Sequence, residues 1–98
     1  MAYPVETPTV YNVTLTTADT EYSQLLPSST RELRFRCRTN YDVRYAFETK
    51  RVATPATPYL TLPAGGDYHS DENDLTAKTL NFASSEAGVV VELEVWTL

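Results

Sequence analysis

Hydrophobic and polar positions alternate in short runs along this 98-residue chain. The clearest run is residues 32–38, Glu-Leu-Arg-Phe-Arg-Cys-Arg, where charged and apolar side chains alternate without interruption. Because successive side chains of a strand point to opposite faces, this run predicts a strand with one buried and one open face. The buried face is expected to hold Leu33, Phe35 and Cys37, and the open face Arg34, Arg36 and Arg38.

The same two-residue period recurs in residues 11–16, 43–48 and 89–97. Shorter apolar runs at residues 21–26, 59–62 and 80–82 are bounded by turn signals rich in proline, serine and glycine. No window of about eleven or more residues has a helical period. The chain is therefore predicted to be all-β: an antiparallel β-sandwich or a small jelly-roll-like barrel of about seven or eight short strands. The pattern leaves the order of the strands open.

A hairpin is expected where the arginine-bearing strand meets the next run. Residues 39–41, Thr-Asn-Tyr, make a short polar connection between the two runs. Such a connection predicts tight antiparallel pairing of the strands on either side of it. In the second of these strands, alternation places Val43, Tyr45 and Phe47 on the core side.

The domain organisation follows from the first residues. Residues 1–9 contain two prolines and no periodic pattern, which predicts an extended N-terminal arm ahead of a single β-sandwich domain at residues 10–98. We expect no secretory signal, because no charged segment with an apolar core and cleavage site opens the chain. We also expect no membrane span, because the longest apolar run, residues 87–91, is far too short.

The charge is unevenly distributed. Seven of the eight basic residues lie between Arg31 and Arg51, where they face only three acidic residues. The remainder of the chain has one lysine and ten acidic residues, and the whole chain has a net charge of −5. Because nucleic-acid binding usually requires an excess of basic residues, this balance argues against a nucleic-acid partner. It favours an acidic partner for the arginines, either within the chain or on a neighbouring subunit.

The search for catalytic or metal-binding chemistry centres on the acidic stretch of residues 67–74, which holds the only histidine, His69. Neighbouring residues of an extended loop point away from one another, so its serine, histidine and aspartates do not predict a catalytic triad. Leu75 stands where a calcium loop requires an oxygen ligand, and one histidine with the inward Cys37 does not make a zinc site. We expect no catalytic residues, no metal and no cofactor.

Glu92, Glu94 and Trp96 share one face of the last predicted strand. Two carboxylates could serve a glycoside hydrolase, but nothing else indicates a cleft. Cross-strand pairing with the arginines is the preferred interpretation. Alternation places Trp96 on the face opposite the apolar residues of this strand, and an exposed tryptophan is typical of an interface.

The second half of the chain resembles small structural proteins of tailed bacteriophages. The resemblance rests on residues 59–66, Tyr-Leu-Thr-Leu-Pro-Ala-Gly-Gly, and on residues 80–96, which contain a serine and alanine-glycine turn and a valine-rich strand ending in tryptophan. The Arg-Phe-Arg-Cys-Arg strand and the run after it also fit. The resemblance implies a virion component, either a head decoration (cement) protein or a neck or tail accessory protein, and it implies no catalytic residues.

The resulting hypothesis is a non-enzymatic virion structural protein, most simply a capsid decoration protein, assembled in the host cytoplasm. Its partners would be the major capsid protein or neighbouring structural subunits, in a homo-oligomer, without membrane or nucleic acid. The predicted interface residues are Tyr3, Pro4, Val5, Arg34, Arg36, Arg38, Arg44 and Trp96. A glycan-binding module that uses exposed aromatic residues and residues 67–74 is the alternative from another class, and a small hydrolase built around His69 is a third.

Overall fold

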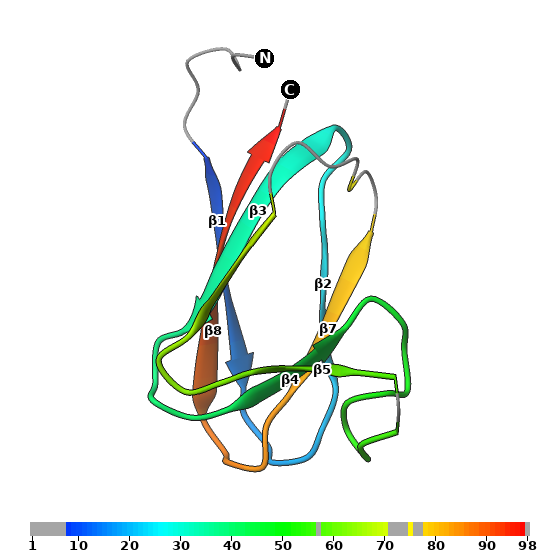
Figure 1. Ribbon diagram of the computed structural model, residues 1–98, viewed down its shortest axis with the longest axis vertical. Coiled ribbons are helices and arrows are strands. Elements are labelled where there is room, and N and C mark those ends of the chain that lie inside the picture. The colour runs from blue at the N-terminus through cyan, green and yellow to red at the C-terminus, as the bar shows by residue number, and fades with distance from the viewer. Residues whose placement is uncertain (1–7, 57, 71–74, 76–77, 98) are drawn as a thin grey trace.

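The computed structural model describes residues 8–56, 58–70, 75 and 78–97 of the chain. They form eight strands in two four-stranded antiparallel sheets packed as a sandwich (Figure 1). The all-β prediction is therefore confirmed. The strands are β1 (Thr9–Leu15), β2 (Tyr22–Leu25), β3 (Thr30–Cys37), β4 (Val43–Ala46), β5 (Leu60–Leu62), β6 (Asp67–Ser70), β7 (Thr79–Ala83) and β8 (Val89–Thr97).

The strand order is that of a jelly roll. The first sheet has the order β1-β8-β3-β6 and the second the order β2-β7-β4-β5. The pairs β1 with β8, β2 with β7, β3 with β6 and β4 with β5 are all antiparallel and nested around the middle of the chain. This is the arrangement obtained when one long hairpin is rolled into two facing sheets, as in the double Greek key of jelly rolls. The structure thus decides a question that the sequence pattern left open.

The core lies between the two sheets and is centred on Phe35 of β3. The Phe35 ring packs edge to face against Tyr45 and Phe82, at centroid distances of 5.0 and 5.3 Å, and stacks on Tyr68 at 4.8 Å. Aromatic pairs in these geometries stabilise a core beyond the area that they bury. The prediction that alternate residues of this strand point into the core is confirmed for Leu33 and Phe35, which are buried. Cys37 is only partly buried.

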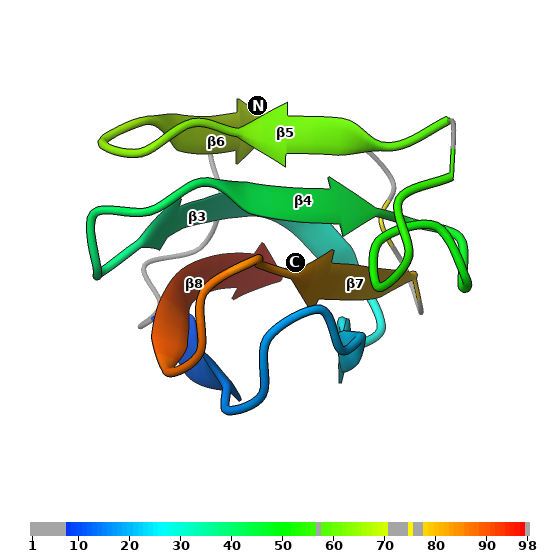
Figure 2. The same ribbon diagram turned by 90° about the horizontal axis from the view of Figure 1, so that it is seen from below.

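The predicted hairpin between β3 and β4 is wrong. β3 pairs with β8 and β6, whereas β4 pairs with β7 and β5, so the connection between them crosses from one sheet to the other (Figure 2). Alternation reports only which face of a strand is buried, and that face is the same whether two strands are neighbours in a sheet or lie across the sandwich. Phe47 is also misplaced by the prediction, because β4 ends at Ala46 and the Phe47 side chain is 37% exposed.

The turn from β5 to β6 explains the Pro63-Ala64-Gly65-Gly66 sequence. The Gly66 amide donates a hydrogen bond to the Pro63 carbonyl at 2.9 Å, and Gly65 has φ of +79°. This is the geometry of a type II turn, which requires a positive φ at its third residue and so favours glycine there. The turn leads the chain from the second sheet into the first.

Part of the outer face of the second sheet, over β4 and β7, is covered by the chain itself. Residues 47–56 fold back over it, and Val52 is fully buried against Ala46, Ala83 and Tyr59. The Arg44 guanidinium donates from Nε to the Val52 carbonyl at 2.7 Å. We call residues 47–56 the covering segment. The outer face of the first sheet has no such cover among the described residues.

Two sequence predictions concern chain segments near the limits of the description. β1 begins at Thr9, so the last residue of the predicted arm already belongs to the sheet. Tyr3, Pro4 and Val5 lie outside the described residues. The acidic stretch expected to be a loop begins as strand β6, while residues 71–74 lie outside the description.

Among the described residues there is no helix of the length and apolar character that a membrane span requires.

Candidate functional site

The open outer face of the first sheet carries cross-strand rows of charged and polar side chains. Strand register places these side chains in line, because residues directly opposite one another project to the same side of a sheet. We call this surface the charged face. Its first row is Val10, Glu94, Arg34 and His69, and its second row is Asn12, Glu92, Arg36 and Asp67, in the strand order β1-β8-β3-β6.

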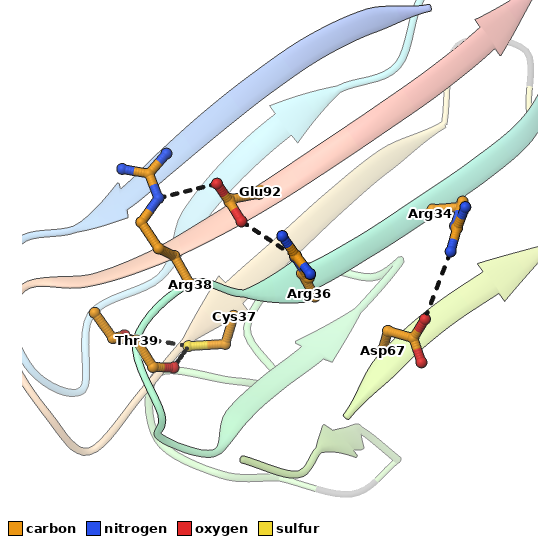
Figure 3. Close-up of polar contacts among 7 residues, drawn as sticks. All are labelled: Arg34, Arg36, Cys37, Arg38, Thr39, Asp67 and Glu92. Atoms are coloured by element: carbon orange, nitrogen blue, oxygen red, sulfur yellow. Dashed lines mark hydrogen bonds and ion pairs between the residues drawn. The ribbon is translucent and has the colours of Figure 1, made fainter. Parts of the chain in front are cut away.

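Glu92 is the centre of the charged face, because it binds two arginines from the neighbouring strand (Figure 3). Arg36 Nε donates to Glu92 Oε1 at 3.3 Å, and Arg38 Nε donates to Glu92 Oε2 at 2.9 Å. The hydrogen bond from Arg38, followed by that from Arg36, lowers the pKa of Glu92 below its ordinary value, against the opposing effect of partial desolvation. The predicted ladder between glutamate and cross-strand arginines is therefore confirmed for Glu92.

The third ion pair of Figure 3 joins β3 to the edge strand β6. Arg34 Nη2 lies 3.9 Å from the Asp67 carboxylate. On the same face, His69 Nε2 lies 3.4 Å from Glu32 Oε1. Both pairs run diagonally, since Arg34 is directly opposite His69 in the register. The two side-chain contacts link β6 to β3 in addition to the backbone pairing.

The charged face is a balanced mosaic rather than a basic patch. Its outward positions hold three arginines against four acidic residues. The arginines are Arg34, Arg36 and Arg38, and the acidic residues are Glu32, Asp67, Glu92 and Glu94. The basic excess in the sequence from Arg31 to Arg51 is thus offset here by acidic residues from β6 and β8. Counted over the described residues, this face therefore has no surplus of positive charge for a neighbouring subunit.

Trp96 lies at the end of the charged face. It is opposite Glu32 in the register and is partly buried rather than fully exposed. Its indole Nε1 donates to Glu94 Oε1 at 3.2 Å. Glu94 therefore binds Trp96 rather than Arg34, which stands opposite it, and the ladder prediction does not hold for Glu94. The indole is oriented by this hydrogen bond, with part of its surface accessible.

Arg44 is not part of the charged face. It lies on β4 in the second sheet, and its side chain is only 15% exposed. Its guanidinium is occupied by Asp19, at 2.8 Å, and by the Val52 carbonyl. The predicted interface set therefore divides between two sheets: Arg34, Arg36, Arg38 and Trp96 share one face, whereas Arg44 holds the covering segment on the other sheet.

Two shallow depressions lie on the charged face and share Glu92 and Arg36. One is bordered by Val10 of β1 and Asp67 of β6, and the other by Arg38 and Gly65. Cys37 also borders the second depression, and its thiol contacts the Thr39 carbonyl and hydroxyl. The depressions follow the rows of paired charges, so any bound group would meet arginine and glutamate together.

The geometry of β6 does not assemble a catalytic triad. His69 and Asp67 project to the charged face, whereas Ser70 is 7% exposed and projects toward the core, so the serine and the histidine point to opposite sides of the strand. Within the described part of the chain, no group of three histidine, cysteine or acidic side chains is placed to hold a metal ion.

Sequence reasoning missed two exposed apolar features. Val10 on β1 is 61% exposed on the charged face, and its outward position was already readable from the parity of Tyr11 and Val13. A shallow apolar depression beside β4 and β5 includes Phe47 and Tyr59. No sign of it is present in the sequence, because it depends on β4 ending at Ala46.

Comparison of the chain with protein-family models, with curated proteins and with solved structures gives no match.

Proposed function

We propose that the chain is a non-enzymatic virion structural protein of a tailed bacteriophage, of the capsid decoration or cement type. The observation that carries the proposal is the difference between the two outer faces of the sandwich. The second sheet is covered over β4 and β7 by residues 47–56, whereas the first presents an ordered array of charges with Val10 exposed at one side and Trp96 at one end. One face is thus built for contact with another surface.

The fold and the sequence resemblance support the virion part of the proposal. Jelly rolls occur in viral capsid domains, although the same fold also serves lectins and enzymes, so the fold alone does not decide function. The segments that carry the resemblance are structural in this chain. They form the type II turn between β5 and β6, the turn before β8, and β8 itself.

The charge pattern suits specific docking rather than general adhesion. An exposed ion pair contributes only about 0.2–1 kcal/mol, so the charges of this face set orientation more than strength. A partner must present complementary charges in register with rows about 7 Å apart, the distance between alternate residues of a strand. Affinity would then come from apolar contact at Val10 and Trp96, and from the many copies that a lattice holds at once.

Binding to capsids tests the proposal. Purified protein is mixed with expanded capsids of the phage that encodes it, and co-sedimentation is measured at low and high salt. We expect saturable binding that weakens as salt screens the charged face. The variant Arg36→Gln/Arg38→Gln should lose binding, whereas Lys50→Gln/Lys78→Gln, which removes equal charge outside this face, should retain it. Absence of binding to capsids would contradict the decoration form.

The position of the protein in a reconstruction of the intact particle separates the related possibilities. Density on the outer surface of the head supports decoration. Density at the portal, neck or tail supports the accessory role instead. Absence from the purified particle, established by mass spectrometry, would reject a virion protein of either kind.

Glycan binding is a second candidate function, favoured by the apolar depression beside β4 and β5. It is lined by Phe47, Tyr59 and Leu60 together with the Glu48 carboxylate. Aromatic faces and an adjacent carboxylate are groups that can contact the apolar side and the hydroxyls of a sugar ring. A glycan array, with and without calcium, tests this function. Reproducible binding that Phe47→Ala abolishes and Trp96→Ala leaves intact would place it at this depression.

A further inference from the structure

The edges of the two sheets differ in how they are protected. β1 and β6 are the edge strands of the first sheet, and β2 and β5 are those of the second. An edge strand presents unpaired backbone groups to any other chain, so natural proteins keep edge strands short or place charges, prolines or bulges on them. An edge that lacks these features is available for pairing.

Three of the four edges carry such protection. β5 is three residues long and is followed at once by Pro63. β2 is four residues long and is followed closely by Pro27. β6 is four residues long and holds Asp67 and His69 on its outward side. Each is therefore a poor template for a further strand.

β1 has none of these features within its length, although Pro8 directly precedes it. It is seven residues long, with the sequence Thr-Val-Tyr-Asn-Val-Thr-Leu, and it contains no charge, proline or glycine. Its register with β8 is continuous from Thr9 to Leu15, so no bulge turns the edge away. Val10 is 61% exposed. No hydrogen bond joins the free edge of residues 9–14 to another described residue.

We infer that β1 pairs with β1 of a second copy, antiparallel and across a two-fold axis, to form a continuous eight-stranded sheet. This inference refines the homo-oligomer part of the proposed function and rests on it, but it does not depend on where in a virion the protein lies. A two-fold axis makes an isologous contact, in which one edge serves both partners. The sheet would then present two charged faces side by side.

The sequence of β1 is self-complementary in this arrangement. The register that pairs all seven residues is centred on Asn12, so that Asn12 meets Asn12 of the second copy. It brings Val10 opposite Thr14 and Tyr11 opposite Val13 of the second copy, and these are residue types that stabilise cross-strand pairs. The nearest charged side chains in the row of Asn12, which are Glu92 of each copy, would be three strand spacings apart, or about 14 Å. That separation exceeds the Debye length at physiological salt, so they oppose pairing only weakly.

The mass of the full chain in solution tests the pairing. Sedimentation equilibrium over a range of concentrations should show reversible formation of a species of twice the 11.0 kDa monomer mass. Hydrogen exchange should show that the amides of β1 become better protected as concentration rises, while those of β2 and β5 do not. A monomer at every concentration would overturn the inference, as would a dimer without added protection in β1.

A charge exchange at Asn12 tests the register. Asn12→Lys and Asn12→Asp should each weaken the dimer by about five-fold or more, because each places like charges directly opposite one another at the axis. An equimolar mixture of the two variants should restore dimers by pairing lysine with aspartate. The control Leu25→Lys adds the same charge to the exposed edge of β2 and should leave the dimer unchanged. Failure of the mixture to recover, or an equal loss with Leu25→Lys, would overturn the proposed geometry.

The capsid experiment is independent of this result. If Asn12→Lys is monomeric and still binds capsids, both the pairing and the virion function stand. If the wild type dimerises through β1 and no capsid binds it, the pairing stands and the decoration function fails. If capsids bind a protein that never dimerises, the function stands and the pairing fails.

Discussion

Arg38 and Glu92 are 54 residues apart in the sequence, and Arg38 Nε donates to Glu92 Oε2 at 2.9 Å. Arg36 donates to the other oxygen of the same carboxylate. Arg36 lies on β3 and Arg38 directly follows this strand, so their charges would repel each other, and the glutamate of β8 binds both. The contact therefore joins the central strands of the first sheet and sets the orientation of two guanidinium groups that face solvent.

Glu92→Gln is expected to lower the free energy of unfolding modestly at neutral pH, because it removes the charge from both hydrogen bonds. Glu94→Gln is the matched control, since a glutamine oxygen can still accept the hydrogen bond from Trp96. Urea unfolding followed by circular dichroism measures the difference. Equal midpoints for Glu92→Gln and the wild type at pH 7 would show that the two pairs contribute nothing.

The stability difference between wild type and Glu92→Gln should also depend on pH. The arginines lower the pKa of Glu92 in the folded state relative to its ordinary value of 4.5. A carboxylate of this kind stabilises the fold above the unfolded pKa, and the stabilisation is lost as pH falls through the folded pKa. The two unfolding curves should therefore differ at pH 7 and converge in acid. A difference that persists unchanged at pH 2 would contradict this account.

Tyr45 is expected to make the fold sensitive to alkali. Burial, followed by the nearby Tyr68, raises the pKa of Tyr45 above its ordinary value of 10.0. The neutral phenol therefore stabilises the folded state fully below pH 10, and this contribution is lost as pH rises through the raised pKa. Tyr45→Phe should unfold at higher pH than the wild type, as measured by circular dichroism during alkaline titration. Identical transitions would show that another group controls alkaline unfolding.

Phe35→Ala should destabilise the protein by roughly 3–5 kcal/mol, because it leaves a cavity among three aromatic rings. For a domain of this size, much of the total stability would be lost. Val10→Ala, on the same sheet but exposed, should change stability by no more than about 0.5 kcal/mol. Thermal unfolding of the two variants provides the comparison, and similar losses for both would refute the placement of the core.

Val52→Ala should loosen the covering segment while leaving the sandwich folded. Two buried methyl groups contribute roughly 1.5–2 kcal/mol, and Val52 is fully buried against the outer face of the second sheet. The segment contains Lys50 and Arg51, which are sites for trypsin. Cleavage at these sites, followed by mass spectrometry, should become several-fold faster in the variant. An unchanged rate would mean that Val52 does not hold the segment in place.

The strands and their buried faces were predictable because alternation is a local property. Residues 32–38 needed no distant information to indicate that Phe35 faces a core and Arg36 faces solvent. The kind of residue that pairs with Glu92 was also predictable, since a glutamate on the outer face of a strand pairs most readily with basic residues of the neighbouring strand. The position of Arg44 was not, because its environment is made by Asp19 and Val52 from two separate loops.

The sequence by itself determined that the chain is an all-β domain with half-buried strands, and that one strand carries three outward arginines. Only the tertiary structure decided that β3 and β4 lie in different sheets, that the arginines meet acidic residues from β6 and β8, and that one outer face is partly covered while the other is open. The physical reason is that side-chain alternation specifies which way a residue points but not which strand stands beside it. Neighbours are chosen by the packing of the whole roll, where pairings between distant segments bury the aromatic core and leave β1 at an unprotected edge.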